Sequence, residues 1–103
     1  MANDLYALEK LVEAVDALVA GTGRVRERLF AAAKFFIQIR QEDIPEGELR
    51  CLFADLKNTL TSGLAGADEA SVAHTLRAKT AEEAAAIARL IFDLFRELDR
   101  LPQ

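Results

Sequence analysis

The sequence predicts an all-α fold: an antiparallel four-helix bundle, formed as one domain by residues 1–103. Three observations support this prediction. Ala and Leu are abundant, while the chain has only two prolines and five glycines, a composition that favours helices. Apolar residues recur at helical spacing along most of the chain. They form four segments of about 16–20 residues, joined by mostly short connections.

The first two predicted helices span residues 4–20 and 24–41. We expect Asn3 or Asp4 to cap the first helix and Gly21 to end it in a left-handed conformation. Its apolar stripe consists of Leu5, Leu8, Val12, Val15 and Val19, widened by Leu11 and Leu18. The second helix is built on Val25, Leu29, Ala32, Phe36 and Ile39.

The other two long helices are predicted at residues 45–61 and 81–100. Their apolar faces are Leu49, Leu52, Phe53, Leu56 and Leu60, and then Ile87, Ile91, Leu94, Phe95 and Leu98. A pair that resembles a capping box lies at the start of each: Asp43 with Glu46, and Thr80 with Glu83. Between the two helices, residues 62–71 are expected to form a loop and residues 72–77 a possible short extra helix.

The helix at 24–41 is apolar over an unusually large part of its circumference. With Phe36 as zero and about 100° per residue, Phe30 and Ile37 lie near +100° to +120° and Phe35 near −100°. The apolar arc is therefore about 220° wide, compared with roughly 100° or more for an ordinary amphipathic helix.

Two explanations for this wide apolar arc remain open. Either neighbouring helices cover both flanks within the monomer, or one flank binds a partner, most simply in a two-fold dimer. The expected anchors of a partner-binding surface are Phe30, Phe35 and Ile37, with Arg24 and Arg28 setting the orientation. A stable dimer would also need Phe92 or Tyr6, because three side chains only just offset the free energy that association costs.

The net charge of −4 argues against a general nucleic-acid-binding protein, although the charges are unevenly distributed. Residues 24–40 contain five basic side chains and one acid, Glu27. The simpler interpretation places this basic segment beside acidic neighbours in the bundle. The alternative is a nucleic-acid-associated accessory factor that uses Arg24, Arg26 and Arg28 at the start of the second helix.

Nothing in the sequence indicates catalysis, a cofactor or a metal, so we expect that the protein is not an enzyme and binds no cofactor or metal. His74 and Cys51 are the only residues of their kinds, and zinc needs three or four nitrogen or sulfur ligands. Cys51 is expected to be a partly buried thiol, and His74 a polar residue at the edge of the short helix. The stretch GTGR at 21–24 follows a helix and not a strand, so it is neither a Walker loop nor a dinucleotide fingerprint.

The sequence also indicates a cytoplasmic protein without a membrane anchor. A single cysteine excludes an internal disulfide. No apolar run approaches the roughly 18 residues of a membrane span. The start, MANDLYALEK, carries acids where an export signal carries basic residues.

Three stretches resemble small all-helical bacterial proteins of unknown function that are carried on mobile genetic elements. They are GTGRVRERL at 21–29, EDIPEGELRCLFADLKNTLT at 42–61 and SVAHTLRAKTAEEAAAIARLIFDLF at 71–95. The resemblance implies a bacterial accessory protein and no particular activity. Together with the apolar helix face, it predicts a small interaction or regulatory protein that forms a homodimer or binds a protein partner.

Overall fold

The computed structural model describes residues 4–21, 23–61 and 69–101. All the regular structure in these residues is helical, so the predicted all-α class is confirmed. The elements are α1 (Asp4–Ala20), α2 (Val25–Phe36), the 3-10 helix η1 (Gln41–Asp43), α3 (Glu48–Thr61), α4 (Glu69–Arg77) and α5 (Ala81–Arg100). The extra short helix begins earlier than predicted, so residues 69–71 are helical. The rest of the predicted 62–71 loop, like the predicted cap Asn3, lies outside the described residues.

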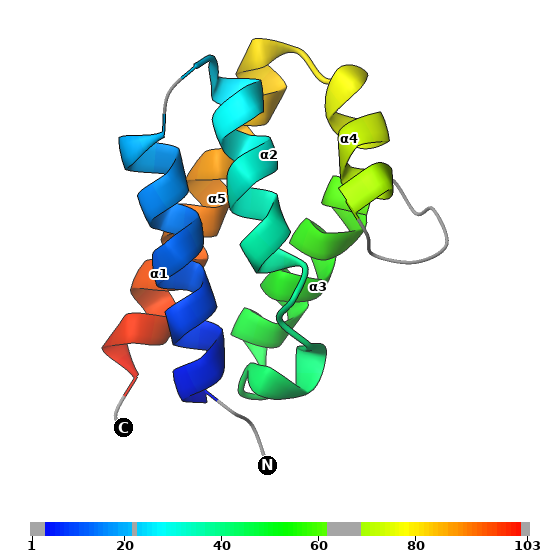
Figure 1. Cartoon of the computed structure of the whole chain (residues 1–103). Helices are drawn as coiled ribbons and strands as arrows, with labels where there is room; N and C mark the ends of the chain where they lie inside the picture. The colour runs from blue at the N-terminus through cyan, green and yellow to red at the C-terminus, as the bar shows by residue number, and fades with distance from the viewer. Residues whose placement is uncertain (1–3, 22, 62–68, 102–103) are drawn as a thin grey trace.

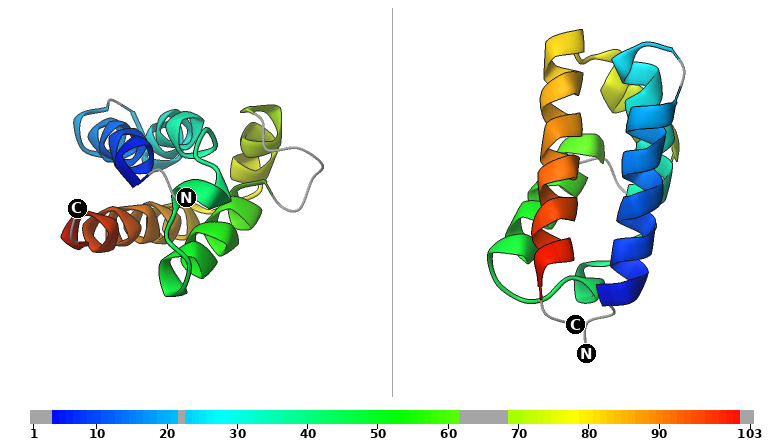
Figure 2. Two further views of the ribbon diagram at one scale, coloured as in Figure 1. Left: turned by 90° about the horizontal axis from the view of Figure 1, so that it is seen from below. Right: turned by 90° about the vertical axis from the view of Figure 1, so that its left-hand side faces the viewer.

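The helices pack side by side, and α2 is the central helix. It packs against α1, α4 and α5, while α3 packs against α4 and α5 (Figures 1 and 2). Figure 1 shows α1 running upward and α2 and α5 running downward, with α3 and α4 following one another along the opposite side from α1. The rings of Phe36 and Phe53 meet in the core with centroids 5.1 Å apart.

Helix α2 ends at Phe36, well before the predicted Gln41. The backbone turns there, and the amide of Ile39 donates to the Phe36 carbonyl at 3.1 Å. This turn buries both Ile39 and Ile44 completely. Lys57 of α3 donates to the Ile39 carbonyl at 3.0 Å, so this turn carbonyl has a partner. Burying two isoleucines after the turn explains why the helix does not continue.

Helix α3 begins at Glu48, later than predicted, because Gly47 has φ of +121°. This conformation lies outside the right-handed helix and suits glycine. The predicted pairing of Asp43 with Glu46 is wrong. The Asp43 carboxylate accepts from the backbone amide of Arg40 at 2.9 Å and so stabilises η1 instead of α3.

The connection between α1 and α2 depends on two glycines for different reasons. The left-handed residue is Gly23, with φ of +95°, and not Gly21 as predicted. Gly21 is constrained by space, since a Cβ there would collide with the carbonyl oxygen of Ala17. The side chain of Arg28, from α2, caps the C-terminal end of α1: its Nη1 donates to the Leu18 carbonyl at 3.0 Å.

Helix α5 matches the prediction at both ends. The predicted capping box is confirmed: Thr80 Oγ1 accepts from the Glu83 amide at 3.1 Å, and Glu83 accepts from the Thr80 amide at 2.9 Å. The buried face consists of Ala84, Ile87, Ile91, Leu94 and Leu98.

Candidate interaction surface

Helix α1 buries a different face from the one that its apolar pattern predicts. Ala7, Leu11 and Ala14 are fully buried. The predicted stripe faces solvent at every seventh residue, with Leu5, Val12 and Val19 exposed by 65%, 49% and 75%. Leu8 and Val15, between them, are half-buried. The predicted stripe is therefore split: Leu11 is buried, Leu8 and Leu18 pack against the core, and Leu5, Val12 and Val19 form an apolar edge of the exposed surface.

Small side chains explain why α1 buries the face that contains Ala7, Leu11 and Ala14. Helix α1 packs on α2 and α5. Ala7 and Ala14 of α1, Ala32 and Ala33 of α2 and Ala84 of α5 are all fully buried. The distance between helix axes depends on the side chains at the contact, and alanines let helices approach closely. The buried residues 7, 11 and 14 repeat at helical spacing as well, so periodicity alone does not choose between the two faces.

The exposed stripe of α1 lies on the flank that faces α5. On the other flank, Lys10 extends toward α2, with its Nζ 6.0 Å from the centre of the Phe35 ring. With Leu11 as zero, Lys10 lies near −100° and Val12 near +100°. The whole exposed stripe therefore lies opposite α2, along the side where α5 runs (Figures 1 and 2).

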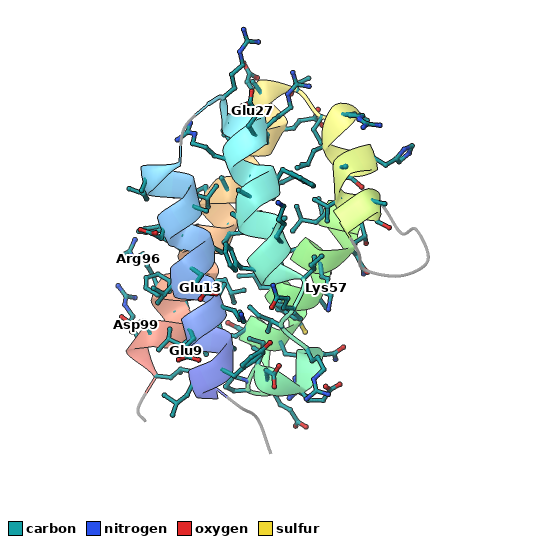
Figure 3. All side chains as sticks on the ribbon, viewed as in Figure 1. Glu9, Glu13, Glu27, Lys57, Arg96 and Asp99 are labelled. Carbon is teal, nitrogen blue, oxygen red and sulfur yellow. The ribbon has the colours of Figure 1, made fainter. Side chains whose placement is uncertain are left out.

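Helix α5 adds two aromatic rings beside this stripe. Phe92 is 37% exposed, Phe95 is half-buried, and their ring centroids lie 6.3 Å apart. The Arg96 guanidinium lies 5.8 Å from the Phe92 ring centre. Positions 92, 95, 96 and 99 share one side of α5 by helical spacing, and in Figure 3 Arg96 and Asp99 lie at the left edge of the molecule, where α5 runs behind α1. We call Leu5, Leu8, Val12, Val15 and Val19, with Phe92 and Phe95, the α1/α5 face.

Charged side chains border the α1/α5 face with unequal signs. The outer row of α1 is acidic, and the outer row of α5 is mixed and carries three arginines. The exposed members are Glu9, Glu13 and Asp16 on α1, and Arg89, Arg96, Glu97, Asp99 and Arg100 on α5. Ion pairs within each helix join Glu13 to Lys10 at 3.4 Å, Arg89 to Asp93 at 3.6 Å and Arg100 to Glu97 at 3.3 Å. In Figure 3, Arg96 lies near the level of Glu13, and Asp99 lies lower, nearer the level of Glu9.

The predicted partner anchors on α2 are partly covered by the protein itself. Phe30, Phe35 and Ile37 are half-buried and pack against the core. Lys10 of α1 lies near the Phe35 ring. Contacts with α1, α4 and α5 cover α2 on several sides. Their role as partner anchors remains a prediction, and the α1/α5 face offers apolar side chains that are more exposed to solvent.

The three arginines at the start of α2 do not form one exposed row. Arg28 is half-buried, bonds to the Leu18 carbonyl at 3.0 Å and keeps a buried Nε without a hydrogen-bond partner. Arg26 is exposed and donates to the Lys79 carbonyl at 3.2 Å. Arg24 is also exposed. This separation weakens the alternative of a nucleic-acid-binding stripe along α2.

The two groups with shifted pKa values lie away from the α1/α5 face. Burial lowers the pKa of Lys57, against the opposing charges of Glu42 and Asp43. Hydrogen bonds from the backbone and side chain of Thr80 lower the pKa of Glu83. Both groups stabilise local structure: Lys57 bonds to the turn after α2, and Glu83 completes the cap of α5.

The candidate residues for chemistry do not come together. Cys51 is exposed, contrary to the predicted partly buried thiol, and lies near the start of α3. His74 is exposed on α4, at the far end of the α3–α4 side (Figure 1). Within the described residues, no three His, Cys, Asp or Glu side chains gather where they could hold a metal ion.

No helix in the described ranges is both long and apolar enough to span a membrane. Comparison with models of known protein families, with curated proteins and with solved structures finds no match to this chain.

Proposed function

We propose that this chain is a small helical interaction protein that forms a homodimer through the α1/α5 face. The observation that supports the proposal most is the exposure of Leu5, Val12 and Val19 on α1, beside the partly exposed Phe92 on α5. Contiguous apolar patches of this kind on soluble domains usually mark interaction sites. The proposal keeps the expected function and moves its surface from α2 to α1 and α5.

The α1/α5 face is large enough for a small dimer interface. Helix α1 has 17 residues, which corresponds to a length of about 25 Å. Two neighbouring helices are about 20 Å across. The face therefore offers about 500 Å² per copy and about 1,000 Å² in total, near the lower limit of specific interfaces.

The energetics favour a weak, reversible dimer. Fully burying a Val, Leu or Phe side chain gains about 1.5–3 kcal/mol, and these side chains are already partly covered. Four of them in each copy would contribute about 8 kcal/mol in total. Association costs about 4–15 kcal/mol. The most favourable balance is a net gain of about 4 kcal/mol, so we expect a Kd of about one millimolar.

The charges favour one geometry for the dimer. If α1 of one copy lay on α1 of the other, the acidic rows would face each other, with Glu9, Glu13 and Asp16 on both sides. If α1 lies antiparallel on α5 of the partner, these acids face a row of mixed charge in which Arg96 is the nearest cation, while Arg89 and Arg100 pair with Asp93 and Glu97 of their own helix. We propose the second arrangement, in which a two-fold axis parallel to the helices relates the copies.

Sedimentation equilibrium over a concentration series tests the proposal. Val12→Asp places a charge in the middle of the α1/α5 face, and Ala86→Asp places the same charge at an exposed position on the other flank of α5. We expect the wild type and Ala86→Asp to dimerise with similar Kd, and Val12→Asp to stay monomeric while its circular dichroism remains unchanged. A wild-type chain that is monomeric at millimolar concentration would refute the proposal.

The finer expectations about architecture and setting are also proposals. In the antiparallel four-helix bundle that we propose, α1, α2, α3 and α5 are the main helices and α4 is the extra one. A cytoplasmic setting is supported by the single free thiol, Cys51, because free thiols are kept reduced in that compartment. A bacterial accessory role is supported only by the resemblance in sequence.

A further inference from the structure

A cleft of about 430 Å³ lies between the first turns of α2 and the second half of α4. Its floor is apolar and consists of Phe30, Ala73 and Leu76. Phe30 and Ala73 are half-buried, and Leu76 is almost fully buried. The floor is thus the edge of the hydrophobic core, left uncovered where α4 meets α2.

Three arginines from two helices surround this floor: Arg24 and Arg26 from α2, and Arg77 from the last turn of α4. All three are exposed. Arg26 is held in place because its Nη1 donates to the Lys79 carbonyl at 3.2 Å. That bond uses one of the five N–H donors of its guanidinium group.

The start of α2 and the end of α4 border the same cleft with opposite ends of their helix dipoles. The N-cap residue, Arg24, makes no side-chain hydrogen bond to the first turn. The positive end of the helix dipole therefore coincides with the arginines. At the opposite wall, the Thr75 and Leu76 carbonyls of α4 accept from the Ala78 and Lys79 amides at 3.1 and 3.2 Å, so they are engaged by backbone donors.

One acid, Glu27, also lines the cleft. Its carboxylate lies against Gly23, at the place that a Cβ on Gly23 would occupy. The side chain is therefore folded back toward the turn before α2, at the upper end of the molecule in Figure 3. The side chains that line the cleft carry three positive charges and one negative charge.

We infer that this cleft binds a small organic anion: a carboxylate or a phosphate monoester that carries an apolar body. The planar guanidinium groups match both headgroups in a two-pronged geometry. The apolar body would cover Phe30 and Leu76. The volume of the cleft falls in the range of small-molecule sites, which combine apolar walls with a few convergent polar groups. The inference rests on the cleft alone and is independent of dimer formation.

The apolar floor and the arginine rim together favour a ligand that has both an apolar and an anionic part. A bare inorganic anion would leave the apolar floor exposed to water. A neutral apolar molecule would gain nothing from the three arginine side chains. Only a ligand with an anionic group and an apolar body contacts both the arginines and the apolar floor. Molecules with one of the two parts are therefore the controls.

Amide chemical shifts of the full ¹⁵N-labelled chain test the inference. The probes are octanoate and octyl phosphate, with octanol, acetate and inorganic phosphate as matched partial ligands. We expect octanoate or octyl phosphate to shift the amides of residues 24–30 and 73–79, and the other three to bind at least about tenfold more weakly. Octanol binding as tightly as octanoate, or shifts confined to the α1/α5 face, would overturn the inference.

Variants separate the contributions of charge and shape. Arg77→Gln removes one rim charge, and Arg100→Gln removes the matching last-turn arginine of α5, away from the cleft. Ala73→Phe fills the floor without changing any charge. We expect Arg77→Gln to weaken octanoate binding by about three- to tenfold, Ala73→Phe to abolish it, and Arg100→Gln to leave it unchanged. If Ala73→Phe binds like the wild type, the cleft is not the site.

Discussion

Three arginines at the start of α2 show how residues of one type acquire different roles. Arg28 closes the end of α1 through the Leu18 carbonyl. Arg26 joins α2 to the turn before α5 through the Lys79 carbonyl. Arg24 makes no side-chain cap hydrogen bond and lines the cleft. Two of the three arginines, Arg26 and Arg28, therefore connect helix ends through backbone carbonyls.

At the start of α5, Glu83 makes stability depend on pH. Hydrogen bonds from Thr80 lower its pKa below the ordinary 4.5. Its stabilising contribution is therefore fully present above pH 4.5 and is lost as the pH falls through the lowered value. We expect Glu83→Gln to unfold at a lower urea concentration than the wild type at pH 7, and the difference to disappear in strong acid.

Glu82→Gln is the matched control, because Glu82 is exposed in the same turn and lies outside the capping box. Its urea midpoint should stay closer to that of the wild type at pH 7. If the midpoint of Glu83→Gln differed from that of the wild type equally at pH 7 and at pH 2, the capping carboxylate would not be the cause.

At the scale of the helix, the sequence predicts the bounds of both α1 and α5, but it predicts the buried face of α5 better than that of α1. The ends of α5 are predictable because Thr80 and Glu83 form a recognisable cap, and because α5 has a single apolar stripe. Helix α1 has two stripes at the same spacing, and the buried one contains alanines, which a hydrophobicity pattern ranks below leucine and valine. Close packing against α2 and α5 favours burial of the face with the smaller side chains. The hydrophobicity pattern of α1 alone contains no information about these neighbouring helices.

The C-terminal end of α2 and the start of α3 differ from the prediction for a similar reason, while the end of α3 at Thr61 matches it. The positive φ of Gly47 and the burial of Ile39 and Ile44 depend on how the turn packs beneath the core. The all-α class and most core residues of α3 and α5 follow from the sequence. The exposed α1/α5 face does not, because its leucine and valines were expected to form the core stripe of α1.

A matched pair of substitutions tests which stripe of α1 is the core. Leu11 is fully buried and Leu5 is 65% exposed. We expect Leu11→Ala to lower the free energy of unfolding by about 2–5 kcal/mol, because it removes transfer energy and leaves a cavity. Leu5→Ala should change it by about 0.5 kcal/mol or less. Urea unfolding at a concentration that keeps the chain monomeric measures both, and similar losses would contradict this orientation of α1.

At the scale of the molecule, the two candidate surfaces lie apart. The α1/α5 face lies on the side of α1, and the cleft lies on the other side of α2, next to α4 (Figure 1). A dimer formed through the α1/α5 face would therefore leave both clefts open to solvent. Such an assembly could present two anion-binding sites while its apolar stripes remain covered. Loss of dimer formation therefore need not remove anion binding, and loss of anion binding need not remove dimer formation.

The proposed dimer geometry makes a specific prediction about charge. In the antiparallel arrangement of α1 on α5 of the partner, Glu13 of one copy faces the neighbourhood of Arg96 of the other. Two-fold symmetry makes this contact twice. We expect Glu13→Arg and Arg96→Glu each to weaken the dimer, by about fivefold or more at low salt, since an exposed pair contributes about 0.2–1 kcal/mol. The double variant should recover much of the loss.

Pairing of α1 on α1 predicts the opposite result for one of these variants. Glu13→Arg would then replace an acid that faces other acids, so the dimer would become tighter, and Arg96→Glu would have little effect. Sedimentation equilibrium of the wild type and the three variants at low and high salt distinguishes the two geometries. All differences should shrink at high salt, where exposed charges are screened.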